Sequence, residues 1–188
     1  GARVTLRRLP YATKEKRHLR NAIPFQLEEE LAADVDDLHF AYVLLDNPID
    51  QDTAELVAAY CDKAWLAGLL GRCAESGIEP AVVIPKPLLL PRPDGWTVAL
   101  TDELLVHNDF AEGFAIDKTM AADAIALFAS AEDTPLRIRV VGDGDELGAL
   151  LPGHLAGLVE PAESTLWQAL ATAALDGPAE INLLQGEF

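Results

Sequence analysis

The fold of this 188-residue chain is best indicated by RNAIPFQLEEELAADVDDLHFAY, residues 20–42, together with INLLQGEF, residues 181–188. In the first stretch, acidic residues stand between apolar residues that recur every four positions, at Ile23, Leu27, Leu31 and Val35. This spacing predicts an amphipathic helix with a core-facing stripe and a solvated acidic face. We expect the helix to run into a strand over Leu38–Leu45.

The residues before this stretch predict a strand and a helix. Arg3–Leu9 alternates enough to form a strand, and Thr13 is suited to cap a helix that runs through Lys14–Ile23. Pro24 has no N–H, and its ring would crowd the carbonyl of Arg20. We therefore expect the helix to kink there, or to restart with Pro24 in its first turn.

The middle of the chain predicts a capped helix between two strands. Leu56–Cys61 is typical of a strand, Asp62 can cap a helix over Lys63–Glu75, and Gly77 can end it. Glu79–Ile84 predicts a further strand. The expected buried face of the helix consists of Trp65, Leu66, Leu69, Leu70 and Cys73.

A proline-rich segment predicts a domain boundary at Arg92–Gly95, which divides the chain into residues 1–92 and 93–188. After the boundary we expect a hairpin, a third strand, a helix capped by Asp117, two more strands and a last helix. These elements are predicted over Trp96–Thr101, Glu103–Asn108, Gly113–Ile116, Lys118–Ala129, Leu136–Val141, Ala156–Glu160 and Ser164–Leu175.

The net charge of −17 argues against a nucleic-acid-binding protein, because phosphate backbones attract basic surfaces. The charge is uneven: residues 1–24 carry +6, which leaves −23 for the rest. An acidic surface of this size would attract basic partners over roughly 10 Å at ordinary salt. The alternative is that the charge serves only solubility.

Composition predicts a well-packed protein without a membrane span. With 50% hydrophobic residues, a chain of this length can bury roughly 70% of its unfolded surface. Its apolar runs are far shorter than the roughly 20 residues that cross a bilayer. The first residues are basic and mostly polar, unlike a signal peptide. Cys61 and Cys73 lack a metal-like spacing and are expected to be buried thiols in a reducing cytoplasm.

The order of several short sequence words resembles the cytoplasmic part of the L protein of bacterial type II secretion systems, the GspL family. The resemblance spans nearly the whole chain. It is carried by Leu9-Pro10, Arg20-Asn21-Ala22-Ile23-Pro24-Phe25, Leu27-Glu28-Glu29, Leu31-Ala32, Asp34-Val35, Leu38-His39 and Ile181-Asn182-Leu183-Leu184-Gln185-Gly186.

This resemblance implies an inner-membrane platform protein with an actin-like cytoplasmic region, one transmembrane helix and a periplasmic domain. The implied fold is α/β with mixed sheets, in two actin-like, RNase H-like lobes. The first lobe would be incomplete, with an inserted subdomain, because its opening hairpin would precede Gly1. The second would end in a membrane-proximal stub. We therefore expect a chain trimmed at both ends, at the cytoplasmic face of the inner membrane.

The function that the resemblance implies is non-enzymatic docking. The chain would recruit the secretion ATPase (GspE type) through that enzyme's N-terminal domain, and would associate with the M and F platform proteins and with itself. No cofactor is expected. Charge, rather than a family motif, favours Glu28, Glu29, Asp34, Asp36 and Asp37 as the ATPase contact. The alternative for these residues is an ordinary solvated helix face.

The alternative function is an actin-like nucleotide-binding protein related to the pilus-assembly M proteins. Such proteins hold phosphates with backbone amides in hairpin turns, usually with a glycine. The turn Leu100-Thr101-Asp102-Glu103 has no glycine, and its carboxylates would repel a phosphate about 4 Å away by roughly 1–4 kcal/mol. At Gly142-Asp143-Gly144 we expect a tight turn, or a degenerate nucleotide site. With no Walker A loop, G-x-S-x-G or paired histidines, no catalytic or metal site is predicted.

Two further hypotheses concern the basic N-terminal part. Its lysines and arginines could bind an anionic membrane surface. They are Arg3, Arg7, Arg8, Lys14, Lys16, Arg17 and Arg20. The incomplete sheet would also leave an unpaired edge at Arg3–Leu9, which invites pairing with another chain.

Core positions are expected for Trp65, Trp96, Trp167, Phe110 and Phe114.

Overall fold

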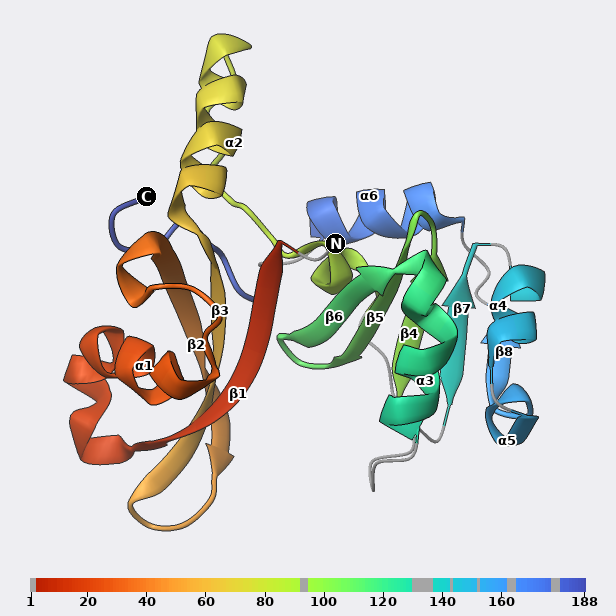
Figure 1. Cartoon of the computed structure of the whole chain (residues 1–188), viewed down its shortest axis with the longest axis horizontal. Helices are drawn as coiled ribbons and strands as arrows, with labels where there is room; N and C mark the ends of the chain where they lie inside the picture. The colour runs from red at the N-terminus through yellow and green to blue at the C-terminus, as the bar shows by residue number, and fades with distance from the viewer. Residues whose placement is uncertain are drawn as a thin grey trace. The chain divides into compact units, whose positions relative to one another are not determined.

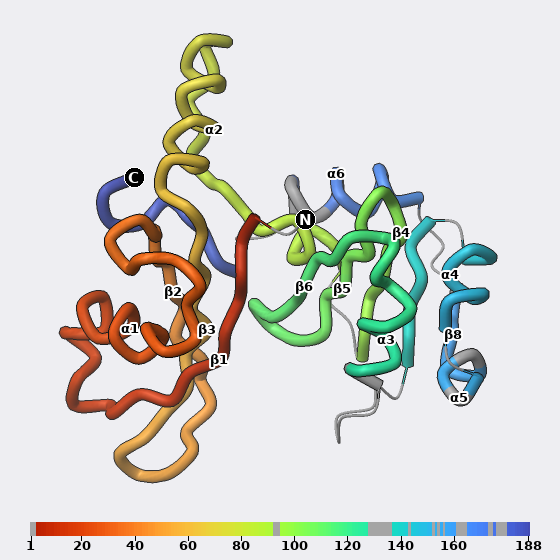
Figure 2. The backbone as a smooth tube through the Cα atoms, in the orientation of Figure 1, coloured from red at the N-terminus to blue at the C-terminus, as the bar shows by residue number. Residues whose placement is uncertain are grey.

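The computed structural model describes residues 3–91, 95–129, 137–142, 144–151, 153–161, 165–176 and 180–188. These residues form a mixed α/β fold with two separate sheets, each in its own compact unit (Figures 1 and 2). The first unit contains residues 3–85 and the C-terminal segment, residues 180–188; the second begins at Lys86. The boundary thus lies after Pro85, whereas the sequence indicated residues 92–95. The chain's end, expected to belong to the second lobe, lies in the first unit.

The sheet of the first unit has three antiparallel strands in the order β1-β3-β2. They are β1 (Val4–Ala12), β2 (Leu38–Pro48) and β3 (Thr53–Asp62). Ala59, on the central strand, is opposite Leu6 on one side and Ala41 on the other. All three predicted strands are confirmed, and each is longer than the sequence indicated.

The helical region between β1 and β2 is more broken than predicted. A 3₁₀ helix, η1 (Thr13–His18), leads into α1 (Leu19–Leu27), and two further 3₁₀ turns follow, η2 (Glu28–Glu30) and η3 (Val35–Asp37). The prediction that Leu31 and Val35 continue the helix is therefore wrong. Three successive glutamates follow Leu27, and negative charge is unfavourable at a helix C-terminus.

Two local predictions for this region are also wrong. Thr13 does not cap a helix: Ala12 holds the cap position, and the Thr13 hydroxyl instead donates to the Asp52 carbonyl at 3.2 Å. Of the two alternatives for Pro24, a kink or a restarted helix, the restart is wrong, because Pro24 lies in the interior of α1 rather than in its first turn. The helix tolerates it because Leu19, Ile23 and Leu27 bury their side chains against the sheet.

Helix α2 (Lys63–Glu75) begins and ends as predicted. The Asp62 carboxylate accepts the Trp65 N–H at 2.6 Å, and Gly77 follows the helix with φ of +69°. Its predicted buried face is formed only in part, because Leu66 is buried and Trp65 is half-buried. The helix continues from the end of β3 and extends beyond the sheet (Figure 1).

The strand predicted over Glu79–Ile84 is absent, and this segment is irregular. Val83 nevertheless pairs with the C-terminal segment. Its N–H donates to Asn182 Oδ1 at 2.9 Å, and its carbonyl accepts the Leu183 N–H at 2.9 Å. Pro80 and Pro85 on either side each lack the N–H that a longer ladder would need.

The second unit contains a five-stranded sheet in the order β6-β5-β4-β7-β8. Strands β4 (Trp96–Leu100), β5 (Glu103–Asp109) and β6 (Glu112–Asp117) form an antiparallel meander, and β7 (Ile138–Val141) and β8 (Val159–Pro161) continue in parallel with β4. The helical elements are η4 (Lys86–Leu89), η5 (Lys118–Met120), α3 (Ala121–Ala129), α4 (Gly144–Leu150), α5 (Gly153–Ala156) and α6 (Leu166–Asp176).

Most elements predicted for this unit are confirmed. Asp117 caps the helical segment, because its carboxylate accepts the Thr119 N–H at 2.9 Å. Strand β8 is shorter than the predicted Ala156–Glu160 and begins at Val159. The core of the unit lies between this sheet and α3 and α4, and it includes Trp96, Ile125 and Leu147. Trp167, expected in the core, is instead 80% exposed.

Candidate docking site

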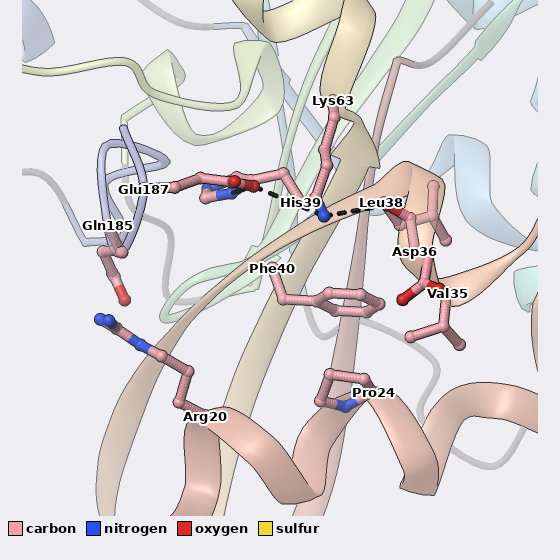
Figure 3. A pocket seen from close by; sticks show the side chains of 11 residues that line it. Arg20, Pro24, Val35, Asp36, Leu38, His39, Phe40, Lys63, Gln185 and Glu187 are labelled. Atoms are coloured by element: carbon pink, nitrogen blue, oxygen red, sulfur yellow. Dashed lines mark hydrogen bonds and ion pairs between the residues drawn. The ribbon is translucent and has the colours of Figure 1, made fainter.

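The two stretches that were most informative in the sequence meet in the first unit. Residues 20–40 of α1, η3 and β2 form one side of a cavity of about 330 Å³, and Gln185–Glu187 form the other (Figure 3). Lys63, at the start of α2, completes the lining. Because the cavity residues of the two stretches, 20–40 and 185–187, are at least 145 positions apart in the sequence (185 − 40), only the folded chain creates this site.

The C-terminal segment is fixed to the edge of β2 by Gln185. The Tyr42 N–H donates to Gln185 Oε1 at 3.2 Å, and Gln185 Nε2 donates to the Tyr42 carbonyl at 3.2 Å. The side-chain amide thus pairs with both main-chain groups of an edge residue, as a neighbouring strand would. This satisfies hydrogen-bonding groups of β2 that its other neighbour, β3, does not use.

Asn182 fixes the start of the same segment. Its Oδ1 accepts the N–H groups of Val83 at 2.9 Å and Leu184 at 3.0 Å, and its Nδ2 donates to the Ala81 carbonyl at 3.3 Å. Ile181 and Leu183 on either side are buried. The apolar residues and Asn182 therefore hold the segment against the irregular residues that follow α2.

His39 is a buried polar residue beside the cavity. Its Nε2 lies 2.6 Å from the Leu183 carbonyl, so this nitrogen donates the hydrogen bond. Its Nδ1 is 4.0 Å from Glu187 Oε1, and the Phe188 ring packs edge-on against the imidazole at 5.0 Å between centroids. His39 therefore contributes to the position of the C-terminal segment.

Lys63 connects the three parts of the site. Its ammonium donates to the Asp36 carbonyl at 2.9 Å and lies 3.6 Å from Glu187 Oε1 (Figure 3). It thereby connects the start of α2 with η3 and with the C-terminal segment. The Lys63 and Glu187 side chains are 38% and 56% exposed, so their ion pair adds little stability by itself.

Gly186, in the C-terminal segment, lies beside Arg20. The φ of Gly186 is +79°, a backbone conformation that favours glycine, and a Cβ there would lie 3.5 Å from Arg20 Nη1. The exposed Arg20 side chain extends from α1 toward Gln185 at the side of the cavity (Figure 3). In the described part of the chain, no hydrogen bond or ion pair engages this guanidinium.

The five predicted contact residues are all exposed. Glu28 and Glu29 are in η2, Asp34 caps η3 by accepting the Asp36 N–H at 2.9 Å, and Asp36 and Asp37 are in η3. Among them, Asp36 lines the cavity. They do not share the helix face that the periodicity suggested, and their role in binding a partner stays a prediction.

Sequence reasoning did not place Arg20, Lys63, Gln185 and Gly186 in a common site, and it considered Arg20 only for a membrane-binding surface. Arg20, Gln185 and Gly186 belong to the two informative stretches, which was the available signal. Nothing in the sequence indicated that the stretches touch. Lys63 appeared only as the first residue of a helix.

The hairpin turn Leu100–Glu103, where an actin-like protein would hold a phosphate, uses its polar groups internally. The Thr101 N–H donates to the Glu103 carbonyl at 2.8 Å, and the Glu103 N–H donates to the Thr101 hydroxyl at 3.1 Å. Lys86 pairs with Glu103 at 3.0 Å and with Asp102 at 3.8 Å. These two amides are therefore engaged. The second candidate, Gly142-Asp143-Gly144, lies partly outside the described residues, since Asp143 is not among them.

Other kinds of site receive no support from the described residues. No group of three or more His, Cys, Asp or Glu side chains in the described ranges could hold a metal ion. No helix in the same ranges is long and apolar enough to cross a membrane. Of the N-terminal basic residues, Arg7 pairs with Glu30 at 3.5 Å and Arg8 with Glu55 at 3.5 Å. The acidic remainder of the unit thus neutralises part of the proposed membrane-binding surface.

Comparison with known sequences gives a consistent result. The family model described as type II secretion system (T2SS), protein L, matches residues 2–188. Type II secretion system protein L of Vibrio cholerae serotype O1 is 31% identical over 180 residues, which cover 92% of this chain and 40% of that protein. The protein of the same name from Dickeya chrysanthemi is 37% identical over 125 residues, 65% of this chain and 30% of that protein. The chain therefore spans less than half the length of these relatives.

Solved structures similar to this chain include the two that follow. One is the cytoplasmic domain of EpsL, an inner-membrane component of the type II secretion system of Vibrio cholerae. It matches with a TM-score of 0.71 and 27% identity, over 99% of this chain and 75% of that chain. The other is a PilM–PilN type IV pilus biogenesis complex, with a TM-score of 0.59 and 16% identity over 89% of this chain and 68% of that chain. At that identity, the second likeness concerns the fold alone.

Proposed function

The chain belongs to the family of type II secretion system protein L, and we propose that it is a non-enzymatic docking domain that recruits the secretion ATPase. It corresponds to the cytoplasmic domain of an inner-membrane component of that system, because it matches the solved EpsL domain over 99% of its length. In this proposal, the N-terminal domain of a GspE-type ATPase binds the first unit, and the docking links that enzyme to the platform for protein export.

The observation that carries the proposal is the site on the first unit. The two stretches that resemble the family most meet there, a cavity opens between them, and exposed carboxylates lie beside it. The hydrogen bonds within the site hold the C-terminal segment on β2. Such an arrangement suits a surface that binds another protein.

The acidic residues make this surface negatively charged. Within the described part of the chain, Glu28, Glu29 and Asp37 have no ion-pair partner, so their charges are available to another molecule. Exposed charges of this kind mainly increase the association rate and favour a partner of opposite charge. The proposal therefore requires a basic surface on the ATPase domain.

Calorimetric titration of the chain with the N-terminal domain of its cognate secretion ATPase tests this function, at about 0.05 and 0.3 M salt. We expect saturable binding that weakens as the salt concentration rises. The charge-reversal pair Glu28→Lys and Glu29→Lys should weaken binding roughly 2- to 30-fold at the lower salt concentration, because each exposed ion pair is worth about 0.2–1 kcal/mol.

A matched control is the pair Asp46→Lys and Glu75→Lys, two exposed acidic residues elsewhere in the same unit. It changes the net charge equally and should reduce affinity much less. Equal losses for the two pairs would show that net charge, and not this surface, steers the partner. Absence of binding by the folded wild-type chain would overturn the proposed function.

We also propose the M and F platform proteins and a second copy of this chain as partners. The open edge of β1 supports self-association, since in the described part of the chain this strand pairs only with β3. Sedimentation over a wide range of concentration tests it. A species that stays monomeric throughout would remove strand pairing between copies.

The actin-like architecture is likewise a proposal. The second unit has the element order of an RNase H-like lobe, with an antiparallel meander extended by two parallel strands. The first unit would be the remainder of an incomplete first lobe with its inserted subdomain. An experimental structure of a longer chain that begins before Gly1 tests this: a second RNase H-like sheet should be completed by the added residues.

A further inference from the structure

The cavity in the first unit combines an apolar floor with one unengaged cation. Phe40 and Pro24 lie next to each other on the floor, with Val35 beside them (Figure 3). The Arg20 guanidinium stands at one side, close to Gly186. An apolar group bound over Phe40 would therefore place its own neighbouring atoms next to Arg20.

The other charged groups of the cavity are already partnered or lie apart from Arg20. Lys63 holds the Asp36 carbonyl and pairs with Glu187. The Asp36 side chain lies on the Val35 side, across Phe40 from Arg20 (Figure 3). Arg20 thus remains as the group whose charge and planar fork of donors are free to bind an anion, and a carboxylate fits that fork with two parallel hydrogen bonds.

The size of the cavity limits what can bind. Its volume of about 330 Å³ is at the lower end of the roughly 300–1,000 Å³ of sites for small-molecule ligands. It suits one large apolar side chain with the residue that follows it better than a whole nucleotide. The open position at the side of α1 and the C-terminal segment allows an extended segment of another protein to enter.

We propose that this cavity binds a short segment of a partner protein, in which an apolar side chain covers Phe40 and Pro24 and an adjacent carboxylate pairs with Arg20. The inference rests on the proposed docking function in taking the ATPase domain as the source of the segment. The ATPase domain would then carry an acidic residue for Arg20 within the basic surface that the carboxylates of η2 and η3 would attract.

Such a ligand would contact α1 and the C-terminal segment at once. Arg20 comes from α1, whereas Gly186 and Gln185 come from the C-terminal segment. Binding should therefore stabilise the segment on β2, and by linkage a well-docked segment should raise the affinity for the ligand. Whether the C-terminal segment is held on β2 would therefore depend on whether the partner is bound.

A pair of peptides tests the cavity independently of the ATPase. Acetyl-Phe-Glu-amide and acetyl-Phe-Gln-amide differ only in the carboxylate, and both can be titrated into the isotopically labelled chain while NMR shifts are followed. We expect saturable shifts at Phe40 and Gly186 with the Glu peptide, and weaker shifts with the Gln peptide. Arg20→Ala should abolish the difference between them, and Arg20→Lys should restore part of it. Shifts that are absent, or equal for both peptides, would overturn the proposed site.

Titration with the ATPase N-terminal domain then tests the source of the segment. Arg20→Ala should weaken binding about 10- to 150-fold, the effect of losing a charge-assisted hydrogen bond. The control Arg17→Ala removes an exposed arginine of η1 that does not line the cavity, and should change affinity less than about twofold. Equal effects of the two variants would exclude the ATPase domain as the occupant. If the wild-type chain does not bind that domain, the proposed function fails, and the peptide titration still decides the cavity.

Discussion

Gln185 is the side chain that most directly couples the end of the chain to the sheet. It makes two hydrogen bonds to Tyr42 and one to the Asn182 carbonyl at 3.0 Å. We expect Gln185→Ala to lower the free energy of unfolding of the first unit by about 1–3 kcal/mol, because partly buried main-chain groups lose their partners. Urea denaturation measures the change.

Two variants make this prediction specific. Gln185→Glu keeps an acceptor for the Tyr42 N–H but loses both donated bonds. Its decrease in the free energy of unfolding should therefore lie between those of Gln26→Ala and Gln185→Ala, or exceed that of Gln185→Ala. Gln26→Ala, at an exposed position of α1, should be almost neutral. If Gln185→Ala is as neutral as Gln26→Ala, water replaces the amide and the side chain does not anchor the segment.

The two cysteines are expected to differ in reactivity. Burial, with a smaller contribution from the Asp62 charge, raises the pKa of the Cys61 thiol to about 11. Cys61 is 2% exposed, whereas Cys73 is half-buried. Because the thiolate is the nucleophile, iodoacetamide at about pH 8 should label Cys73 and spare Cys61 in the native chain. Mass spectrometry in the absence and presence of urea measures both sites, and equal native rates would contradict the burial of Cys61.

At the scale of single elements, the helical segment after β6 should depend on pH through Asp117. Hydrogen bonds from the Thr119 side chain and then its N–H hold the pKa of the Asp117 carboxyl below its ordinary value. Because the folded-state pKa is the lower one, the stabilisation is complete above the unfolded-state pKa. It is lost as pH falls through the folded-state pKa. A carboxyl ¹³C titration should give a midpoint for Asp117 below that of an ordinary aspartate.

The variant Thr119→Val separates the side-chain contribution from that of the main chain. It removes the hydroxyl that donates to Asp117 at 2.6 Å and keeps the N–H. The midpoint of Asp117 should therefore rise toward the ordinary value without reaching it. An unchanged midpoint would mean that the Thr119 hydroxyl does not lower the pKa of Asp117.

The α1–η3 region shows how an element can differ from its periodicity. The apolar spacing of Ile23, Leu27, Leu31 and Val35 is helical, yet α1 ends at Leu27. Leu31 then adopts an extended backbone, with φ of −79° and ψ of 133°. The spacing persists because each of these residues still lies toward the sheet or the cavity, and the three glutamates after Leu27 disfavour a continued helix.

For the molecule as a whole, the return of the chain's end to the first unit has a testable consequence. Deleting residues 180–188 removes buried Ile181 and Leu183, each worth about 1.5–3 kcal/mol, and uncovers the edge of β2. Hydrogen exchange should show loss of protection in β2 and β3 and little change in β4 and β5. A shorter deletion, Gly186–Phe188, should cost less because Ile181, Leu183 and Gln185 remain. Equal loss of protection in both units would contradict the assignment of the segment to the first unit.

The sequence by itself determined most strands, the caps at Asp62 and Asp117, and the family. These features depend on residues that are neighbours in the chain: alternation along a strand, a carboxylate two or three positions before the N–H that it accepts, and words that can be compared one by one. The exposure of the carboxylates at Glu28, Glu29, Asp34, Asp36 and Asp37 was also predictable, because ionised groups remain in water unless they are paired.

Only the tertiary structure decided the site. Gln185 can replace a strand at the edge of β2, Arg20 can lie beside Gly186, and Lys63 can connect η3 with Glu187 only once segments far apart in the chain are adjacent. The same reason explains the errors. Glu79–Ile84 has the composition of a strand, but it hydrogen-bonds instead to the C-terminal segment, through Ala81 and Val83. Local periodicity carries no information on such partners, because their free energy comes from contacts between distant residues.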